Sequence, residues 1–189
     1  MDSLTGLLLV TAMTSGPADR APFANRADDA GRSMATIGTR PAVDSIRINP
    51  FVWFDAARKT VHLTLIGGHE GVNGGMNFNG ADRGAATLTV PLGWRVSATF
   101  RNRDAALPHS VIIVPAVTPV PVVAGEAAFP GAVSATPVDG VTEGEESHFA
   151  FTAAREGEYL ILCAVPGHGT AGMWIGLSIS ASATRPAYR

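Results

Sequence analysis

The chain has 189 residues, of which 46% are apolar and only 16% are charged, and its formal net charge is −2 at pH 7. This length suits one globular domain with extensions, and the frequent glycines and prolines favour turns over long helices. Because there is no run of Lys or Arg, there is no electrostatic basis for nucleic-acid binding. The single cysteine, Cys163, excludes an intramolecular disulfide, so it is a free thiol, a metal ligand or a nucleophile.

The N-terminal segment contains a short apolar stretch, LTGLLLVTAM at 4–13. Its length fits the apolar part of a secretory signal and falls far short of the roughly 20 residues that cross a bilayer. However, no Lys or Arg precedes it, and Asp2 has the wrong sign for a signal. We predict that residues 1–42 are a signal or flexible lead-in that also allows membrane association, and that residues 43–189 form the folded domain.

The sequence from about Val43 onward alternates between apolar and polar residues with the period of a β-strand. In TVHLTLI at 60–66, apolar residues alternate with polar neighbours, which is typical of a half-buried strand. Further strand-like runs lie at 86–90, 94–100, 110–114, 148–152, 158–163 and 173–180. Seven or eight short strands separated by turns predict an all-β, antiparallel sandwich or barrel.

A proline-rich segment at about 115–147 interrupts this rhythm. It is too short for a second domain and too apolar for a solvated linker. We therefore predict an irregular insertion that packs over the sandwich.

The residues best suited to chemistry are concentrated in CAVPGHGTAGM at 163–173, between two predicted strands. Cys163 ends one strand and Met173 begins the next, so a hairpin loop brings both toward one point, with His168 midway. An extended loop would span roughly 33 Å, so it must fold back, which its glycines and Pro166 permit. Two imidazoles and one thiolate in a trigonal site, with a distant axial thioether, form the blue-copper arrangement.

Such a site needs a second histidine, and His109 is the strongest candidate. It lies in LPHSVIIV, held by Pro108 where an apolar strand begins, and rigid strand ends are where ligands converge. We predict four ligands for one type-1 copper ion per chain: His109, Cys163, His168 and Met173. The histidines expected to be solvated or hydrogen-bonded instead are His62, His69 and His148.

Four short motifs make the chain similar to the sulfocyanins, and next to the rusticyanins, within the cupredoxin superfamily. They are MNFNG at 76–80, VPLGW at 90–94, LPHS at 107–110 and PGHGTAGMW at 166–174, and they occur in sulfocyanin order. The resemblance extends over about residues 60–180. It implies a Greek-key β-sandwich of the cupredoxin type, which agrees with the strands expected from the period.

The resemblance also implies a function, that of a soluble electron carrier. Its copper would shuttle between Cu(II) and Cu(I) with no substrate bound, so we expect no enzymatic activity. The partners would be respiratory proteins, such as a cytochrome or a haem–copper terminal oxidase. We expect a monomer in the periplasm or on the outer face of the cytoplasmic membrane. Ser110, where many cupredoxins have asparagine, resembles the rusticyanin and sulfocyanin branch.

Other functions fit these residues less well. In copper oxidases and copper nitrite reductases, histidines beside the copper-binding cysteine reach further coppers, whereas Cys163 has Leu162 and Ala164 as neighbours. A blue-copper domain that feeds such an enzyme as its partner is the alternative. A cysteine nucleophile or a zinc site would leave Met173 without a role. A copper chaperone would be expected to contain Cys-x-x-Cys or a methionine-rich tract, and neither occurs.

His168, in the middle of its loop, is the ligand expected to lie nearest the surface. Its uncharged neighbours are Ala164, Val165, Pro166, Ala171 and Gly172. We expect them to form a flat patch suited to the small, weak interfaces of redox partners.

Overall fold

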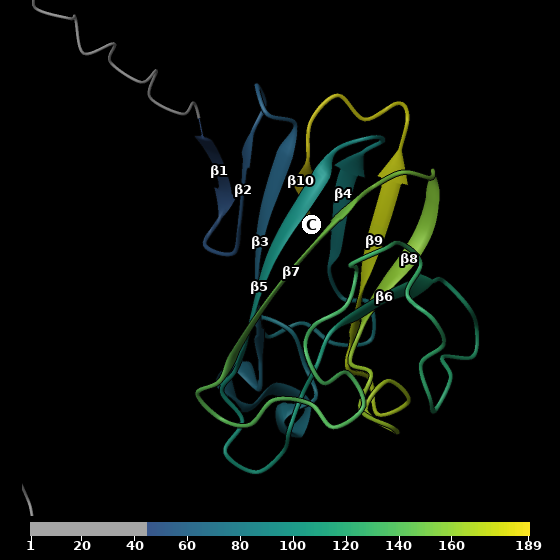
Figure 1. Cartoon of the computed structure of the whole chain (residues 1–189). Coiled ribbons are helices and arrows are strands. Elements are labelled where there is room, and N and C mark those ends of the chain that lie inside the picture. Colours follow the sequence, from purple (N-terminus) through teal and green to yellow (C-terminus); the bar gives the residue numbers. More distant parts are fainter. Residues whose placement is uncertain (1–44) are drawn as a thin grey trace, which may run out of the picture. The chain divides into compact units, whose positions relative to one another are not determined.

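The computed structural model describes residues 45–189, which form two five-stranded β-sheets that face each other (Figure 1). The first sheet contains, in spatial order, β1 (Ser45–Asn49), β2 (Val52–Asp55), β3 (Thr60–Gly67), β5 (Arg95–Asn102) and β7 (Glu146–Thr152). The second contains β10 (Ala187–Tyr188), β4 (Thr87–Pro91), β9 (Trp174–Ser180), β8 (Gly157–Leu162) and β6 (Ile112–Pro115). The predicted all-β sandwich is confirmed.

The core lies between the two sheets because each sheet turns its apolar face inward. In β3, Val61, Leu63 and Leu65 are buried, whereas His62 and Thr64 are only partly buried. β9 shows the same alternation along all of its residues. The strand period in the sequence therefore reports which face of each strand meets the other sheet.

Two strand pairings are parallel, which corrects the antiparallel prediction. β3 pairs with β5 in parallel, and β4 pairs with β9 in the same way. From β3 to β8, each strand lies in the opposite sheet to the one before it, so neighbours within a sheet are distant in the sequence. Such crossing connections are those of a Greek-key sandwich. The period of a strand indicates its buried face and carries no information about the direction of its neighbour.

The described residues contain ten strands, where the sequence predicted seven or eight. The additional strands are β1, β2 and β10, which have five, four and two residues. Segments this short contain too few residues to show a period. They are recognisable only from their pairing, β1 with β2, β2 with β3 and β10 with β4.

The proline-rich segment between β6 and β7 contains no helix or strand. Isolated bridges join Val141 to His109 and Val133 to Ile112, and Phe129 is buried in the core between the sheets. The insertion therefore packs against the sandwich, and one of its bridges reaches a predicted metal ligand.

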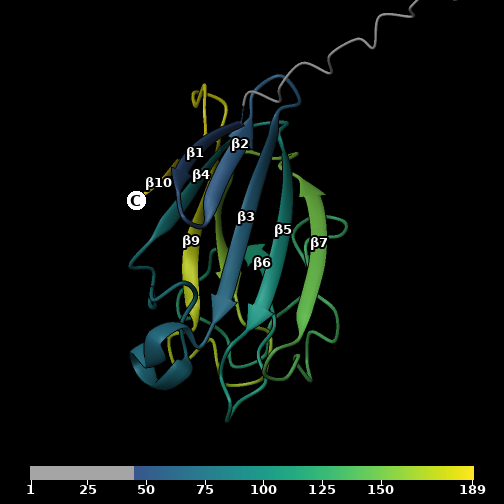
Figure 2. The same ribbon diagram turned by 90° about the vertical axis from the view of Figure 1, so that its left-hand side faces the viewer.

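Three loops gather at one end of the sandwich. β3 and β5 both point toward this end, where β3 is followed by the short 3-10 segment η1 (His69–Gly75), and the loop between β8 and β9 lies there too (Figure 2). Glu70, Gly71 and Gly74 have positive φ, so η1 is a series of tight turns instead of a continuous helix. This end of the sandwich carries the predicted metal site.

The predicted lead-in at 1–42 lies outside the described residues and stays a prediction. Within residues 45–189, no helix has the length and hydropathy needed to cross a membrane.

Candidate metal centre

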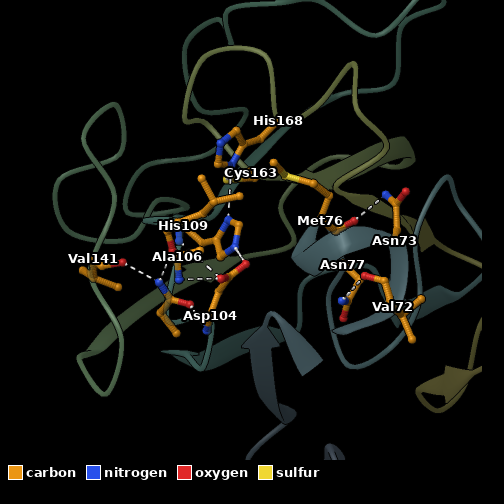
Figure 3. A network of polar contacts seen from close by, with 12 residues as sticks. Val72, Asn73, Met76, Asn77, Asp104, Ala106, His109, Val141, Cys163 and His168 are labelled. Atoms are coloured by element: carbon orange, nitrogen blue, oxygen red, sulfur yellow. Dashed lines mark hydrogen bonds and ion pairs between the residues drawn. The ribbon is translucent and has the colours of Figure 1, made fainter. Parts of the chain in front are cut away.

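Three of the four predicted ligands come together at the loop end (Figure 3). The ligand atoms of His109, Cys163 and His168 all lie within 4.8 Å of one another. Nδ1 of His168 lies 3.2 Å from Nδ1 of His109 and 3.5 Å from Sγ of Cys163. The three residues are 0%, 2% and 8% exposed, in that chain order. In the described part of the chain, no other group of three His, Cys, Asp or Glu residues is close enough to share an ion.

His109 is held in place by the backbone of the insertion. Its N–H donates to the carbonyl oxygen of Val141 at 3.1 Å, and its own carbonyl oxygen accepts the N–H of Val141 at 2.8 Å. Gly140 makes this approach possible, because it has a φ of 77° and a Cβ there would lie 2.8 Å from the His109 nitrogen. The position of this histidine therefore depends on a residue 31 positions later in the chain.

The loop from Cys163 to Met173 folds back on itself as predicted. The N–H of Cys163 donates to the carbonyl oxygen of Met173 at 3.0 Å. The N–H of Met173 donates to the carbonyl oxygen of His168 at 2.9 Å. Gly167 and Gly172 have φ of 85° and 109°, which a residue with a side chain adopts only with strain. Backbone hydrogen bonds thus link all three ligand positions of the loop.

Burial governs the protonation of the three donors. It lowers the pKa of His109, although Asp104 opposes the shift, and it lowers the pKa of His168, where the nearby His109 adds to the effect. Burial also raises the pKa of the Cys163 thiol, and the hydrogen bond from the Ser110 backbone N–H opposes this shift. The metal-free site therefore favours neutral imidazoles and a protonated thiol at neutral pH. A protonated, buried thiol is a poor nucleophile, which argues against cysteine catalysis.

The donor set fits a type-1 copper ion. Donors held about 2.0–2.3 Å from one ion at trigonal angles lie roughly 3.5–3.8 Å from each other. Two of the separations, 3.2 and 3.5 Å, are close to this range, and the ligand atoms of the third pair, His109 and Cys163, lie within 4.8 Å of each other. Two imidazoles and one thiolate are the strong ligands of a blue-copper site, and neutral imidazoles have a lone pair available for a metal.

Ser110 links the two segments that carry the ligands. Its backbone N–H donates to Sγ of Cys163 at 3.4 Å, and its hydroxyl oxygen accepts the N–H of Ala164 at 3.1 Å. The hydroxyl hydrogen goes to the carbonyl oxygen of Pro137, at 2.6 Å, because a carbonyl group only accepts. The side chain of Ser110 therefore directs its hydrogen away from the sulfur.

Asp104 contacts the site, and the sequence analysis did not single it out. Its Oδ2 lies 3.1 Å from Nε2 of His109, and its side chain is 10% exposed. Burial raises the pKa of Asp104, but hydrogen bonds from the Ala106 N–H and the His109 ring outweigh it, so this pKa lies below its ordinary value. In the sequence, Asp104 is one acid in a polar loop, and nothing local distinguishes it from a solvated side chain.

Comparison with known proteins agrees with this geometry. The family model described as the sulfocyanin (SoxE) domain matches residues 49–188, about three quarters of the chain. The chain belongs to the sulfocyanin family. The sulfocyanin of Sulfolobus acidocaldarius is 28% identical to it over 140 residues, which are 70% of each chain. The resemblance that the four sequence motifs indicated is confirmed.

Solved structures of rusticyanin show the same fold as this member of the sulfocyanin family. Rusticyanin from Thiobacillus ferrooxidans is 26% identical, covers 65% of this chain and 78% of its own, and superposes with a TM-score of 0.51. A structure of reduced rusticyanin is 23% identical, covers 65% of this chain and 80% of its own, and also has a TM-score of 0.51. The predicted cupredoxin-type fold is therefore confirmed.

Two methionines of this sulfocyanin-family chain are candidates for a thioether ligand. Met173, the fourth predicted ligand, is fully buried and adjacent to Cys163 across the hairpin, and its role as axial ligand stays a prediction. Figure 3 shows that the thioether of Met76 points toward Cys163 and His168. Met76 opens the MNFNG motif, which signalled the sulfocyanin resemblance without signalling this proximity. Mutation has to distinguish the two thioethers.

The three remaining histidines lie away from the ligand cluster and contact other side chains or solvent. His62 stacks on Trp53 with ring centroids 3.5 Å apart. His69 packs edge-on against Phe51 at 5.6 Å. His148 is exposed on β7. None of them belongs to the ligand cluster within the described residues.

The uncharged patch predicted around His168 needs correction. Ala164 and Gly172 are buried and contribute little surface. Arg83 reaches the loop and donates to the carbonyl oxygen of Ala171 at 2.9 Å, so a positive charge borders it. The loop alone is thus neither as apolar nor as exposed as its sequence indicated.

The insertion supplies apolar surface next to this loop. The N–H of Gly167 donates to the carbonyl oxygen of Val122 at 2.8 Å, and Val122 is 60% exposed. A segment far away in the sequence thereby extends the surface beside His168, which is the least buried of the predicted ligands.

Proposed function

We propose that this member of the sulfocyanin family is a mononuclear type-1 copper protein that carries one electron at a time. The observation that supports this most directly is the buried cluster of His109, Cys163 and His168, with ligand atoms within 4.8 Å of one another. Copper bound by these residues supplies one-electron chemistry by alternating between Cu(II) and Cu(I).

The chain's own contribution is to hold the donors still and to exclude water. The insertion backbone fixes His109, and backbone hydrogen bonds join Cys163 and His168 to Met173. Because these contacts do not involve the metal, the donors keep similar positions in both oxidation states. A site that rearranges little exchanges electrons with a small barrier.

Electron transfer without catalysis is favoured over an enzymatic role. Leu162 and Ala164 flank Cys163, and the sequence contains no His-x-His pair, so the chain lacks the histidines with which copper oxidases and nitrite reductases hold further coppers. The alternative is a blue-copper domain that feeds a copper oxidase or nitrite reductase as its partner. Both candidates share one copper site and differ in the electron acceptor.

We further propose that the protein is a monomer that works outside the cytoplasm, in the periplasm or on the outer face of the cytoplasmic membrane. The apolar stretch at 4–13 supports export or membrane association. The proposed partners are respiratory, a cytochrome or a haem–copper terminal oxidase. The resemblance to sulfocyanins supports this choice.

The test begins with copper titration of the purified protein, followed in the visible spectrum and by voltammetry. We expect one equivalent of Cu(II) to produce an intense thiolate-to-copper charge-transfer band and a reversible one-electron wave. Cys163→Ser should abolish the band, because Cys163 is the only thiol in the chain. A band that persists in this variant excludes a type-1 site. Stopped-flow mixing with a cytochrome, a terminal oxidase or a nitrite reductase then separates the partners.

A further inference from the structure

We propose that Asp104 is a positioning residue of the metal centre, whose carboxylate orients the His109 ring and lowers the reduction potential of the site. The carboxylate contacts one ring nitrogen of His109, and the other ring nitrogen faces the other candidate donors. Oδ2 of Asp104 is 3.1 Å from Nε2, whereas Nδ1 faces His168 at 3.2 Å.

The contact selects one tautomer of His109. An ionised carboxylate only accepts hydrogen bonds, so the hydrogen of the neutral ring is on Nε2, and Nδ1 keeps a free lone pair. That lone pair faces His168 and Cys163, where the other donor atoms lie. The ring is thereby prepared to bind a metal through Nδ1 before any metal arrives.

Asp104 is itself held by the segment that carries it. Its backbone N–H donates to Oδ1 of Asn102 at 2.8 Å, and its Oδ1 accepts the N–H groups of Ala106 and Leu107 at 2.9 and 3.2 Å. Asn102 is fully buried and donates to the carbonyl oxygens of Leu107 and Val141, both at 2.8 Å. The two carboxylate oxygens therefore have separate partners, Oδ1 in its own loop and Oδ2 on His109.

Two glycines at the ends of η1 lie close to Asp104. A Cβ at Gly68 would lie 2.7 Å from Cβ of Asp104, and one at Gly75 would lie 1.9 Å from Oδ2. Both glycines have positive φ, 72° and 92°. Their lack of side chains lets the backbone approach Asp104 closely while its Oδ2 contacts His109.

Aspartate is distinguished here from asparagine by chemistry and not by size. If an asparagine at position 104 turned its NH₂ toward His109, two hydrogen-bond donors, the NH₂ and the ring N–H, would face each other. In the flipped orientation, the NH₂ would instead face the N–H groups of Ala106 and Leu107, which are also donors. Either orientation loses a hydrogen bond that Asp104 makes.

The carboxylate also affects the two oxidation states unequally. Its negative charge polarises the imidazole, which makes Nδ1 of His109 a stronger electron-pair donor to a metal. This stabilises the more positive Cu(II) state. Removing it should weaken Cu(II) binding about 10–100-fold, with a smaller change for Cu(I). Each tenfold by which the loss of Cu(II) affinity exceeds the loss of Cu(I) affinity corresponds to a rise of about 59 mV in the reduction potential.

The experiment compares Asp104→Asn with Asp139→Asn, which removes the same charge from an exposed position of the insertion. Voltammetry of the copper-loaded proteins should show a raised potential for Asp104→Asn and little change for Asp139→Asn. This measurement rests on the proposed copper function. Equal shifts of the potential in both variants would show that only the overall charge of the protein matters, and this would overturn the proposal.

A second measurement uses the metal-free protein and is independent of copper. Nitrogen NMR at pH 7 should show the Nε2–H tautomer of His109 in the wild type and a mixture of tautomers in Asp104→Asn. An Nδ1–H tautomer in the wild type overturns the proposal even if Asp104→Asn fails to fold. The Nε2–H tautomer in a protein that binds no copper would refute the proposed function and leave the positioning contact intact.

Discussion

The backbone N–H of Cys163 donates to the carbonyl oxygen of Met173 at 3.0 Å, so the first and last predicted ligands of the β8–β9 loop are adjacent across the hairpin. This pairing continues that of β8 with β9, in which Leu162 lies opposite Trp174. The sheet therefore sets the separation of the two sulfur-bearing residues, and the loop between them has only to place His168.

The role of Met173 is open to a test in which Met76 serves as the control. A weak axial thioether tunes the site more than it holds the metal, so Met173→Leu should keep copper and colour and raise the potential. A tenfold change in the Cu(I)-to-Cu(II) binding ratio would appear as about 59 mV. Met173→Gln, with a harder oxygen donor, should lower the potential.

Met76→Leu removes the second thioether near Cys163 and His168 and should shift the potential less than Met173→Leu (Figure 3). Voltammetry and visible spectra of the three variants decide the matter. If Met76→Leu changes the potential and Met173→Leu does not, the axial assignment passes from Met173 to Met76.

The histidine assignment predicts a clear division among single variants. His109→Ala should lose type-1 colour because it removes a donor that is fully buried beside Cys163 and His168. His62→Ala and His148→Ala should retain the spectrum, since those rings contact other side chains, and His69→Ala should behave in the same way. The check is the absorbance of each variant at one copper equivalent. Bleaching by His69→Ala with colour kept in His109→Ala would refute the assignment.

Gly140 should matter more for stability than Gly144, which has a similar backbone angle. Gly140→Ala adds left-handed strain and a contact 2.8 Å from the His109 nitrogen, so the free energy of unfolding should fall by about 2–3 kcal/mol. Gly144 also has a positive φ but open space around it, and Gly144→Ala should cost only about 1 kcal/mol.

Gly125→Ala provides the reference, because its backbone angle is unexceptional and nothing lies within 4 Å of the added Cβ. It should be neutral or stabilising by about 0.4–1 kcal/mol. Urea unfolding of the three metal-free variants measures these values. Equal losses of unfolding free energy in Gly140→Ala and Gly144→Ala would show that the insertion can move to accommodate the added methyl group. The position of His109 would then not depend on this contact.

The surface beside His168 should control the rate of electron exchange. Val122→Glu and Val165→Glu place a charge next to the loop and should slow exchange with the physiological partner by about tenfold, while solvent screening leaves the potential nearly unchanged. Leu92→Glu is the matched control, because Leu92 is an exposed apolar residue at the turn between β4 and β5, at the opposite end of the sandwich. Stopped-flow rates and voltammetry are measured on the same samples. Equal rates in all three variants would mean that the electron leaves the protein by another face.

The sequence by itself determined the elements that depend on local chemistry. Alternation of apolar residues identified the buried faces of strands such as β3, because burial of one face imposes a period of two on any half-buried strand. The unique Cys163, with His168 five residues later and Met173 five residues after that, indicated the kind of metal, because a ligand's softness is a property of its side chain alone.

Only the tertiary structure decided which distant segments meet. The parallel pairing of β3 with β5, the contact of Gly140 with His109, and the burial of Ala164 all result from contacts between segments that are far apart in the chain. Asp104 shows the reason most plainly. Five residues before His109 it could face solvent or the ring; the fold places its Oδ2 3.1 Å from the ring, close to the backbone of glycines 29 and 36 positions earlier in the chain. Contacts of that kind depend on which distant segments the fold brings together, and no local sequence pattern contains this information.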